Sequence, residues 1–98
     1  MANNINQPFF LHGERLDIWD NKGASIDRFT VVFTGETPRK SQGMLYRPCV
    51  SMSARPDSST GIYMHGECVN DKHLGKKIMF ADLPKECKKA LIMEVTKP

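Results

Sequence analysis

The stretch IDRFTVVFT, residues 26–34, is the strongest strand signal in the chain. Its β-branched and aromatic residues favour extended backbone, and side chains alternate between the two faces of a strand. One face therefore carries Phe29, Val31 and Phe33. The opposite face carries Thr30, Val32 and Thr34. The stretch predicts a β-sheet with at least one strongly apolar face.

A second strand is predicted just before this one, over Glu14–Trp19, with Leu16 and Ile18 on the same side. Between the two lies DNKG, residues 20–23. Asp, Asn and Gly tolerate the tight or left-handed backbone that turns need. The two strands are therefore expected to form an antiparallel hairpin.

The middle of the chain predicts one long strand between two polar loops. GETPRKSQG, residues 35–43, is a loop bounded by glycines, and SARPDSST, residues 53–60, is the second loop. Residues 44–52 alternate as a strand, although Pro48 lacks the N–H that a sheet ladder uses. Proline in a strand favours a sheet edge or a bulge, so one of the two is expected at Pro48.

The last third predicts two short strands and one helix. The strands are Gly61–Glu67 and Lys76–Ala81, and the helix begins near Asp82 as its N-cap, with Pro84 in the first turn. Its apolar residues follow helical spacing: Leu83, Cys87, Ala90, Leu91 and Val95. Strands followed by one terminal helix predict an α+β fold, with a small curled antiparallel sheet or open barrel and one C-terminal helix.

Length and composition favour one domain. The 98 residues are 40% hydrophobic, which suits a single core over residues 1–98, with the Asn-rich residues 1–8 as a flexible lead. No apolar run is long enough to predict a membrane span. The three cysteines form no paired framework, which favours free thiols in a reducing cytoplasm: Cys49, Cys68 and Cys87.

The charge of +3 is mild, but six lysines between Lys72 and Lys89 face only Asp82 and Glu86. Such an imbalance favours contact with phosphate or with an acidic protein surface, while the alternative is a lysine face that meets only solvent. The two loops and this lysine segment together predict a partner-binding surface. Its candidate residues are Arg39, Lys40, Arg47, Arg55, Lys72, Lys76 and Lys77.

A second predicted site would hold a small anionic or nucleotide-like ligand. Its candidate residues are Tyr63, His65, Glu67 and His73, with Arg55 from the preceding loop. Neither a G-x-x-x-x-G-K-[ST] nor a G-x-G-x-x-G motif occurs, so HLGKK at 73–77 is interpreted as a tight turn at Gly75.

Metal and enzyme chemistry are predicted to be absent. His65, Cys68 and His73 give an H-x2-C-x4-H spacing, but zinc sites usually pair their ligands as C-x2-C or a similar knuckle, and none occurs. A Cys–His pair would need an orienting acid and an oxyanion-stabilising motif, and neither accompanies these residues. The sequence therefore predicts no metal, no cofactor and no catalytic residue.

Two segments carry a family resemblance: IDRFTVVF at 26–33 and HLGKKIMFADLPKEC at 73–87. They resemble the "DRYTVV"-like strand and the "HLGKRI-F-DLP" ending of small accessory proteins of tailed bacteriophages and related mobile elements. The intervening MSARPDSSTGIYMHGE, residues 52–67, is similar in layout. Its PDSST loop departs from the more hydrophobic or histidine-bearing loop expected there, which puts a shared loop ligand in doubt. The resemblance implies no established activity, but it implies an accessory protein acting inside a bacterial host cell.

Three functions follow from these observations. The leading one is stoichiometric, non-enzymatic binding to a host factor or defence complex, as an anti-CRISPR-like or other anti-defence inhibitor. The second is a small-ligand or nucleotide sponge at the site around Tyr63 and His65. The third is an RNA or single-stranded DNA binder that uses the basic residues for backbone contacts, although the mild net charge is low for that role.

Overall fold

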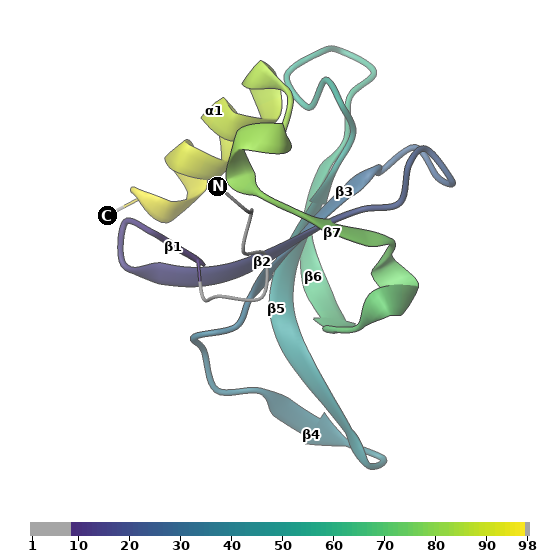
Figure 1. The fold of residues 1–98 in the computed structure, drawn as a ribbon, viewed down its shortest axis with the longest axis vertical. Coiled ribbons are helices and arrows are strands. Elements are labelled where there is room, and N and C mark those ends of the chain that lie inside the picture. Colours follow the sequence, from purple (N-terminus) through teal and green to yellow (C-terminus); the bar gives the residue numbers. More distant parts are fainter. Residues whose placement is uncertain (1–8, 98) are drawn as a thin grey trace, which may run out of the picture.

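The computed structural model describes residues 9–97, and the predicted flexible lead at residues 1–8 lies outside them. The strands are β1 (Phe9–Leu11), β2 (Glu14–Asp20), β3 (Phe29–Phe33), β4 (Arg39–Ser41), β5 (Met44–Met52), β6 (Tyr63–Val69) and β7 (Lys76–Ile78). Two 3-10 turns, η1 (Lys72–Leu74) and η2 (Phe80–Asp82), precede the helix α1 (Lys85–Val95). All strands join one antiparallel sheet that curls without closing (Figure 1). The predicted α+β class and the single C-terminal helix are confirmed.

The sheet is built around the hairpin β2–β3 and the long strand β5. In the hairpin, Leu16 pairs with Phe33 and Asp20 pairs with Phe29. Its turn uses left-handed backbone at Lys22 and Gly23, as DNKG predicts. On β5, the segment Cys49–Met52 pairs with both β3 and β6. These two neighbours therefore lie on opposite sides of β5, and β6 is an outer strand.

Pro48 lies inside a long internal strand, but its missing N–H faces a gap. The amide of Ser53 donates to the carbonyl of Ile62 at 3.0 Å, which marks a hydrogen-bonded pair in the β5–β6 register. Such pairs alternate along a ladder, so the even-numbered residues of β5 point their backbone groups away from β6. On that side β4 ends its pairing at Tyr46 and β3 begins at Cys49. The strand thus loses no ladder bond at Pro48.

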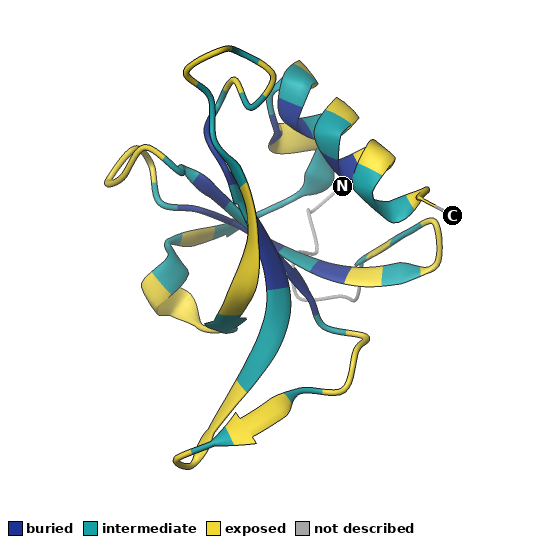
Figure 2. Ribbon diagram, turned by 180° about the vertical axis from the view of Figure 1, so that it is seen from behind, coloured by how far each residue is buried: buried dark blue, intermediate teal, exposed yellow. Residues whose placement is uncertain are grey.

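One face of the sheet carries the main core, and α1 closes it (Figure 2). Five residues of β3 and of the C-terminal half of β5 that point to this face are buried: Phe29, Val31, Phe33, Val50 and Met52. From the C-terminal segment, Leu83, Cys87 and Leu91 pack against them. The alternation predicted for residues 26–34 is therefore correct, and so is the apolar spacing of the helix.

The opposite face carries a smaller core, and the segment containing η1 covers it. Trp19, Val32 and Cys49 are buried there, with Cys68 and Leu74 packed against them. At Gly75 the backbone has φ 121° and passes so close to Asp20 and Asn21 that no side chain would fit. Glycine is therefore required for β7 to reach β2, which agrees with the tight turn predicted in HLGKK.

Several of the predicted boundaries are wrong. The strand predicted over residues 26–34 is β3, Phe29–Phe33, and the strand predicted over residues 61–67 is β6, Tyr63–Val69. Residues 35–43 are not loop throughout, because β4 forms inside them and pairs with β5 through a two-residue turn at Gln42 and Gly43. Both turn residues have positive φ, 51° and 79°, which matches the twist of a tight hairpin. The polar composition of the segment hid this strand.

In the last third of the chain, the strand predicted over residues 76–81 ends at Ile78, and α1 begins at Lys85 rather than near Asp82. The carboxylate of Asp82 accepts from the amide of Met79 at 2.9 Å, so it caps the turn η2. The N-cap position of α1 falls to Pro84. Among the described residues, no helix is long and apolar enough to cross a membrane.

Candidate functional site

Glu94 of α1 contacts two polar side chains of β6 on the main-core face of the sheet. The Tyr63 hydroxyl donates to Glu94 Oε1 at 2.7 Å, and His65 Nε2 lies 2.8 Å from the same oxygen. The two rings meet edge to face with centroids 5.5 Å apart. Burial alone would raise the pKa of Glu94, but the hydrogen bonds from Tyr63 and His65 outweigh it and lower the pKa. The same burial, with the bond to a carboxylate, raises the pKa of Tyr63.

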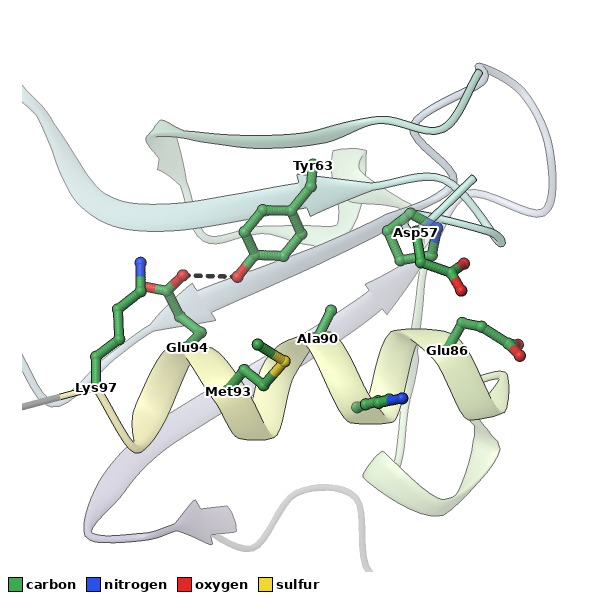
Figure 3. Close-up of a pocket in the computed structure, with 9 residues that line it drawn as sticks. Asp57, Tyr63, Glu86, Ala90, Met93, Glu94 and Lys97 are labelled. Carbon is green, nitrogen blue, oxygen red and sulfur yellow. Dashed lines mark hydrogen bonds between the residues drawn. The ribbon is translucent and has the colours of Figure 1, made fainter. Parts of the chain in front are cut away.

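A pocket of about 300 Å³ opens beside this cluster, between α1 and the loop that follows β5 (Figure 3). The side chains of Ala90 and Met93 point from the helix toward the ring of Tyr63. Charged side chains surround this apolar floor: Asp57, Glu86, Lys89, Glu94 and Lys97. The volume is at the lower end of what small-molecule sites provide, and mixed charges at the rim would orient a small amphipathic ligand.

A second hollow of about 260 Å³ lies on the other side of Glu94. It is shared by β2, β5, β6 and the end of α1, and three carboxylates line it: Glu14, Glu36 and Glu94. The imidazole of His65 and the amine of Lys97 also line this hollow. Glu94 and Lys97 line both hollows, so the end of α1 forms a polar ridge between them.

The structure brings together only part of the predicted ligand site. Tyr63 and His65 meet at Glu94, which sequence reasoning missed. Glu67 lies on the same face of β6 but bonds to Arg39 instead, with Nε–Oε1 and Nε–Oε2 distances of 3.0 and 3.2 Å. His73 lies in η1, within the segment that covers the opposite face. Glu94 comes three residues after the buried Leu91, so the two side chains lie on neighbouring positions of the helix surface. That spacing was the sequence signal that could have placed Glu94 near the sheet.

The predicted basic surface is divided among separate parts of the molecule. Arg39 and Lys40 lie on β4, and Arg55 lies in the loop after β5, with its Nε 3.7 Å from Asp57. Lys72 belongs to η1, and Lys76 is exposed at the start of β7. Figure 1 shows β4, the loop before β6 and the η1 segment pointing in different directions. The chain therefore presents several small basic regions, and no common patch unites the seven predicted residues.

Besides Arg39 and Arg55, two further residues of this predicted set contact other parts of the chain. Arg47 Nη1 donates to the carbonyls of Thr34 and Glu36, both at 3.0 Å, beside the gap at Pro48. This contact fixes the segment that leads from β3 to β4. Lys77 belongs to a polar network on the smaller core, and its side chain is only 26% exposed.

That network joins four side chains. Trp19 Nε1 donates to Asn70 Oδ1 at 2.8 Å, and Asn70 Nδ2 donates to Asp17 Oδ2 at 2.8 Å. Lys77 Nζ lies 3.3 Å from the other oxygen of Asp17 and 5.8 Å from the centre of the Trp19 ring. Reversing the charge of Lys77 would place an acid beside Asp17. The pair Lys76 and Lys77 is therefore not a clean surface for testing partner binding.

The β4–β5 arm, defined as Arg39–Tyr46, projects from the sheet beyond the end of β6 (Figure 1). At its tip, Met44 and Leu45 are each 47% exposed, and Lys40 pairs with Leu45 across the hairpin. Its base is braced because the Arg39 guanidinium binds Glu67 and lies 4.9 Å from the centre of the Tyr46 ring. The arm is thus a firmly held projection with an apolar, basic tip.

The three cysteines are free thiols in different surroundings. Cys87 is buried, its Sγ donates to the Ser53 carbonyl at 3.3 Å, and burial raises its pKa to about 11. On the smaller core, a hydrogen bond with Cys68 and burial raise the pKa of Cys49, and the same contact lowers that of Cys68. Cys68 and His65 lie on opposite faces of β6, because they are separated by an odd number of positions. Within residues 9–97, no cluster of three potential metal ligands is found.

No protein-family model, curated protein or solved structure matches this chain significantly. The resemblance of residues 26–33 and 73–87 to phage accessory proteins therefore stays a prediction. The geometry of the described residues is what any functional proposal must use.

Proposed function

We propose that the protein acts by stoichiometric binding to a host protein complex of the bacterial cell, in the manner of an anti-CRISPR-like or other anti-defence inhibitor. The observation that carries the proposal is the β4–β5 arm, with Met44 and Leu45 exposed at its tip, one on each face of the hairpin. Exposed apolar side chains on a projection are typical of protein contacts, where they fill pockets of the partner.

The basic charge of the arm indicates which kind of partner surface it would bind. Arg39 and Lys40 are exposed and no acidic residue lies within Arg39–Tyr46. An acidic groove with an apolar floor would accept the tip, because its carboxylates would meet Lys40 while Leu45, on the same face of the hairpin, fills the floor. The bracing of Arg39 by Glu67 and Tyr46 keeps the arm in one conformation before binding, which reduces the entropy that association costs.

The test is a pull-down from bacterial lysate with a matched pair of double variants. Lys40→Glu with Leu45→Ser alters the arm tip, and Lys89→Glu with Met93→Ser makes the same kind of change on exposed residues of α1. We expect the wild type and the α1 variant to recover the same host complex in a fixed ratio, and the arm variant to recover none. Equal recovery by both variants would refute the arm as the contact.

The same experiment separates protein binding from nucleic-acid binding. Treatment with nuclease leaves a direct protein contact intact, whereas it releases a complex bridged by RNA or single-stranded DNA. Binding to nucleic acid would also fall steeply as salt rises, because each phosphate contact releases counterions. Loss of the captured complex after nuclease treatment would replace the present proposal with the nucleic-acid one.

The 300 Å³ pocket favours a second candidate, binding of a small ligand against Tyr63. A ligand that binds only the folded state raises the apparent unfolding temperature. We expect a nucleotide panel to contain at least one compound that stabilises the wild type but not Met93→Trp, in which the larger side chain would fill the pocket. Equal shifts in both proteins would place the ligand elsewhere.

A further inference from the structure

β6 presents a long and unprotected sheet edge. Within residues 9–97, no strand pairs with its outer side, and its seven residues run against β5 in unbroken register without a bulge. The other outer strands, β1, β4 and β7, are three residues long, and β4 and β7 carry Arg or Lys. Proteins protect sheet edges with short strands, lysines, prolines and bulges. β6 has none of these features, so its edge is suited to receive another strand.

The outward backbone groups of β6 follow from one hydrogen bond. Ser53 N donates to Ile62 O at 3.0 Å, and these two residues continue the β5–β6 register as a hydrogen-bonded pair. Because such pairs alternate, the backbone groups of Met64, Gly66 and Cys68 point toward β5. The residues with an outward N–H and C=O are therefore Tyr63, His65, Glu67 and Val69.

The sequence of this edge, YMHGECV, is complementary to itself about Gly66. When β6 lies antiparallel to β6 of a second copy, with a two-fold axis at Gly66, His65 faces the partner subunit's Glu67. Tyr63 then faces the partner subunit's Val69, and Met64 faces the partner subunit's Cys68. We propose that the protein forms a homodimer by this pairing, which continues the sheet from one copy into the other.

The pairing uses the backbone as well as the side chains. The outward residues would form hydrogen-bonded pairs, His65 with the partner subunit's Glu67 and Tyr63 with the partner subunit's Val69, and each pair exchanges two backbone bonds. Aromatic with β-branched pairs are a favourable cross-strand combination, and a histidine can hydrogen-bond a carboxylate across the strands. The exposure of Met64, 56%, and of the His65 side chain, 58%, would fall on pairing.

The two faces of the joined sheet receive different pairs. His65, Glu67 and Tyr63 point to the face that carries α1, as the bonds to Glu94 show. Met64 and Cys68 point to the opposite face, where Cys68 already packs near Cys49. At the axis, Gly66 has open space around the position of a Cβ, so the two backbones can approach without a clash.

The first test measures mass against concentration by analytical ultracentrifugation. We expect the wild type to approach twice the 11.1 kDa of one chain as concentration rises. Glu67→Pro removes an outward N–H that no internal bond needs, so the dimer dissociation constant should rise by roughly a hundredfold or more. Arg39→Gln breaks the same Arg39–Glu67 ion pair without touching the edge, and it should leave the dimer unchanged.

The second test fixes the register and does not depend on the folding of the proline variant. Gly66→Cys would place two thiols across the two-fold axis, within the reach of a disulfide. Cys49→Ala and Cys68→Ala are included because Cys49 lies directly opposite Gly66 and could otherwise capture the new thiol within one chain. Oxidised glutathione accepts the two electrons, and we expect a covalent dimer.

The cross-linking control is Ile26→Cys in the same background, at a site that is 68% exposed in the loop between β2 and β3. This variant should remain mostly monomeric on a non-reducing gel. A wild type that stays monomeric up to millimolar concentration would overturn the proposal. So would a dimer that survives Glu67→Pro and fails to cross-link through Gly66→Cys, because its interface would lie elsewhere.

Discussion

One face of the sheet is closed by α1 through apolar contacts, whereas the other is closed by the η1 segment through a small apolar cluster with a polar rim. The first buries Leu83, Cys87 and Leu91 against the sheet. The second buries Trp19, and Asn70 helps to keep its cover in place by accepting a hydrogen bond from Trp19 and donating one to Asp17. Apolar burial drives the closure of both faces. On the first face Glu94 adds hydrogen bonds at the rim, whereas on the second the buried Trp19 itself needs a polar partner.

The difference shows how a small domain can cover two apolar sheet faces with one helix. Apolar burial contributes in proportion to area and tolerates changes of shape, so a helix suits the larger face. The short segment at residues 70–75 has too few apolar residues for the same task. Its Asn70 side chain instead hydrogen-bonds Trp19 and Asp17. Removing any one member of such a network leaves the others without a partner and lowers stability.

The largest effect should come from the helix contact in the main core. Leu91→Ala removes a fully buried side chain and leaves a cavity, so the free energy of unfolding should fall by about 2–5 kcal/mol. Ile92→Ala, one position along and 38% exposed, is the matched control and should cost no more than about 1 kcal/mol. Urea denaturation measures both. Equal costs would mean that α1 does not pack on the sheet as described.

A smaller effect is expected on the opposite face. Trp19→Phe keeps an aromatic ring but removes the donor to Asn70, which should lower the free energy of unfolding by roughly 1–3 kcal/mol. Asn70→Leu, combined with it in a double-mutant cycle, should show that the two losses are not additive. Additive losses would show that the hydrogen bond does not hold the cover in place.

The smallest effect concerns the contribution of Glu94 to the free energy of unfolding, and how that contribution is lost in acid. The folded pKa of Glu94 is lowered, since the bonds from Tyr63 and His65 outweigh burial. Its contribution is therefore present above the pKa of the unfolded chain and is lost as pH falls through the folded value. Glu94→Gln should cost about 1 kcal/mol near neutral pH, and the difference from wild type should shrink in acid. Asp20, whose pKa is lowered first by its bond to Arg28, gives an acid loss common to both proteins.

A difference between wild type and Glu94→Gln that stays constant down to strongly acid pH would contradict this account. It would mean that Glu94 stabilises the helix through packing or through the neutral hydrogen bond alone. Tyr63→Phe separates these cases, because it removes one donor and leaves the carboxylate in place.

Much of the fold could be predicted from local patterns. Residues 26–34 alternate strictly, so the faces of β3 follow from the geometry of a strand. The turn at DNKG and the buried positions Cys87 and Leu91 likewise follow from local backbone preference and helical spacing. One error arose because a polar segment, β4, becomes a strand only by pairing with β5. Another arose because Asp82 could cap either α1 or the turn η2, and it caps η2.

The candidate sites were harder to predict, because their residues lie far apart along the chain. Glu67 and His65 share a face of β6, but their partners, Arg39 and Glu94, come from β4 and α1. Side-chain alternation can place two residues on one face, but it cannot say which distant element meets them. Lys77 shows the same limit, since its bond to Asp17 depends on β7 pairing with β2.

The sequence by itself determined the alternation of β3, the hairpin turn, the helix stripe and the self-complementary order of YMHGECV, because each is a property of neighbouring residues. Only the tertiary structure decided that β6 is an outer strand, that the arm projects, and that Glu94 joins Tyr63 and His65. Those outcomes depend on which strands pair across long loops. Pairing of that kind is set by the burial of whole faces, and no short stretch of sequence contains it.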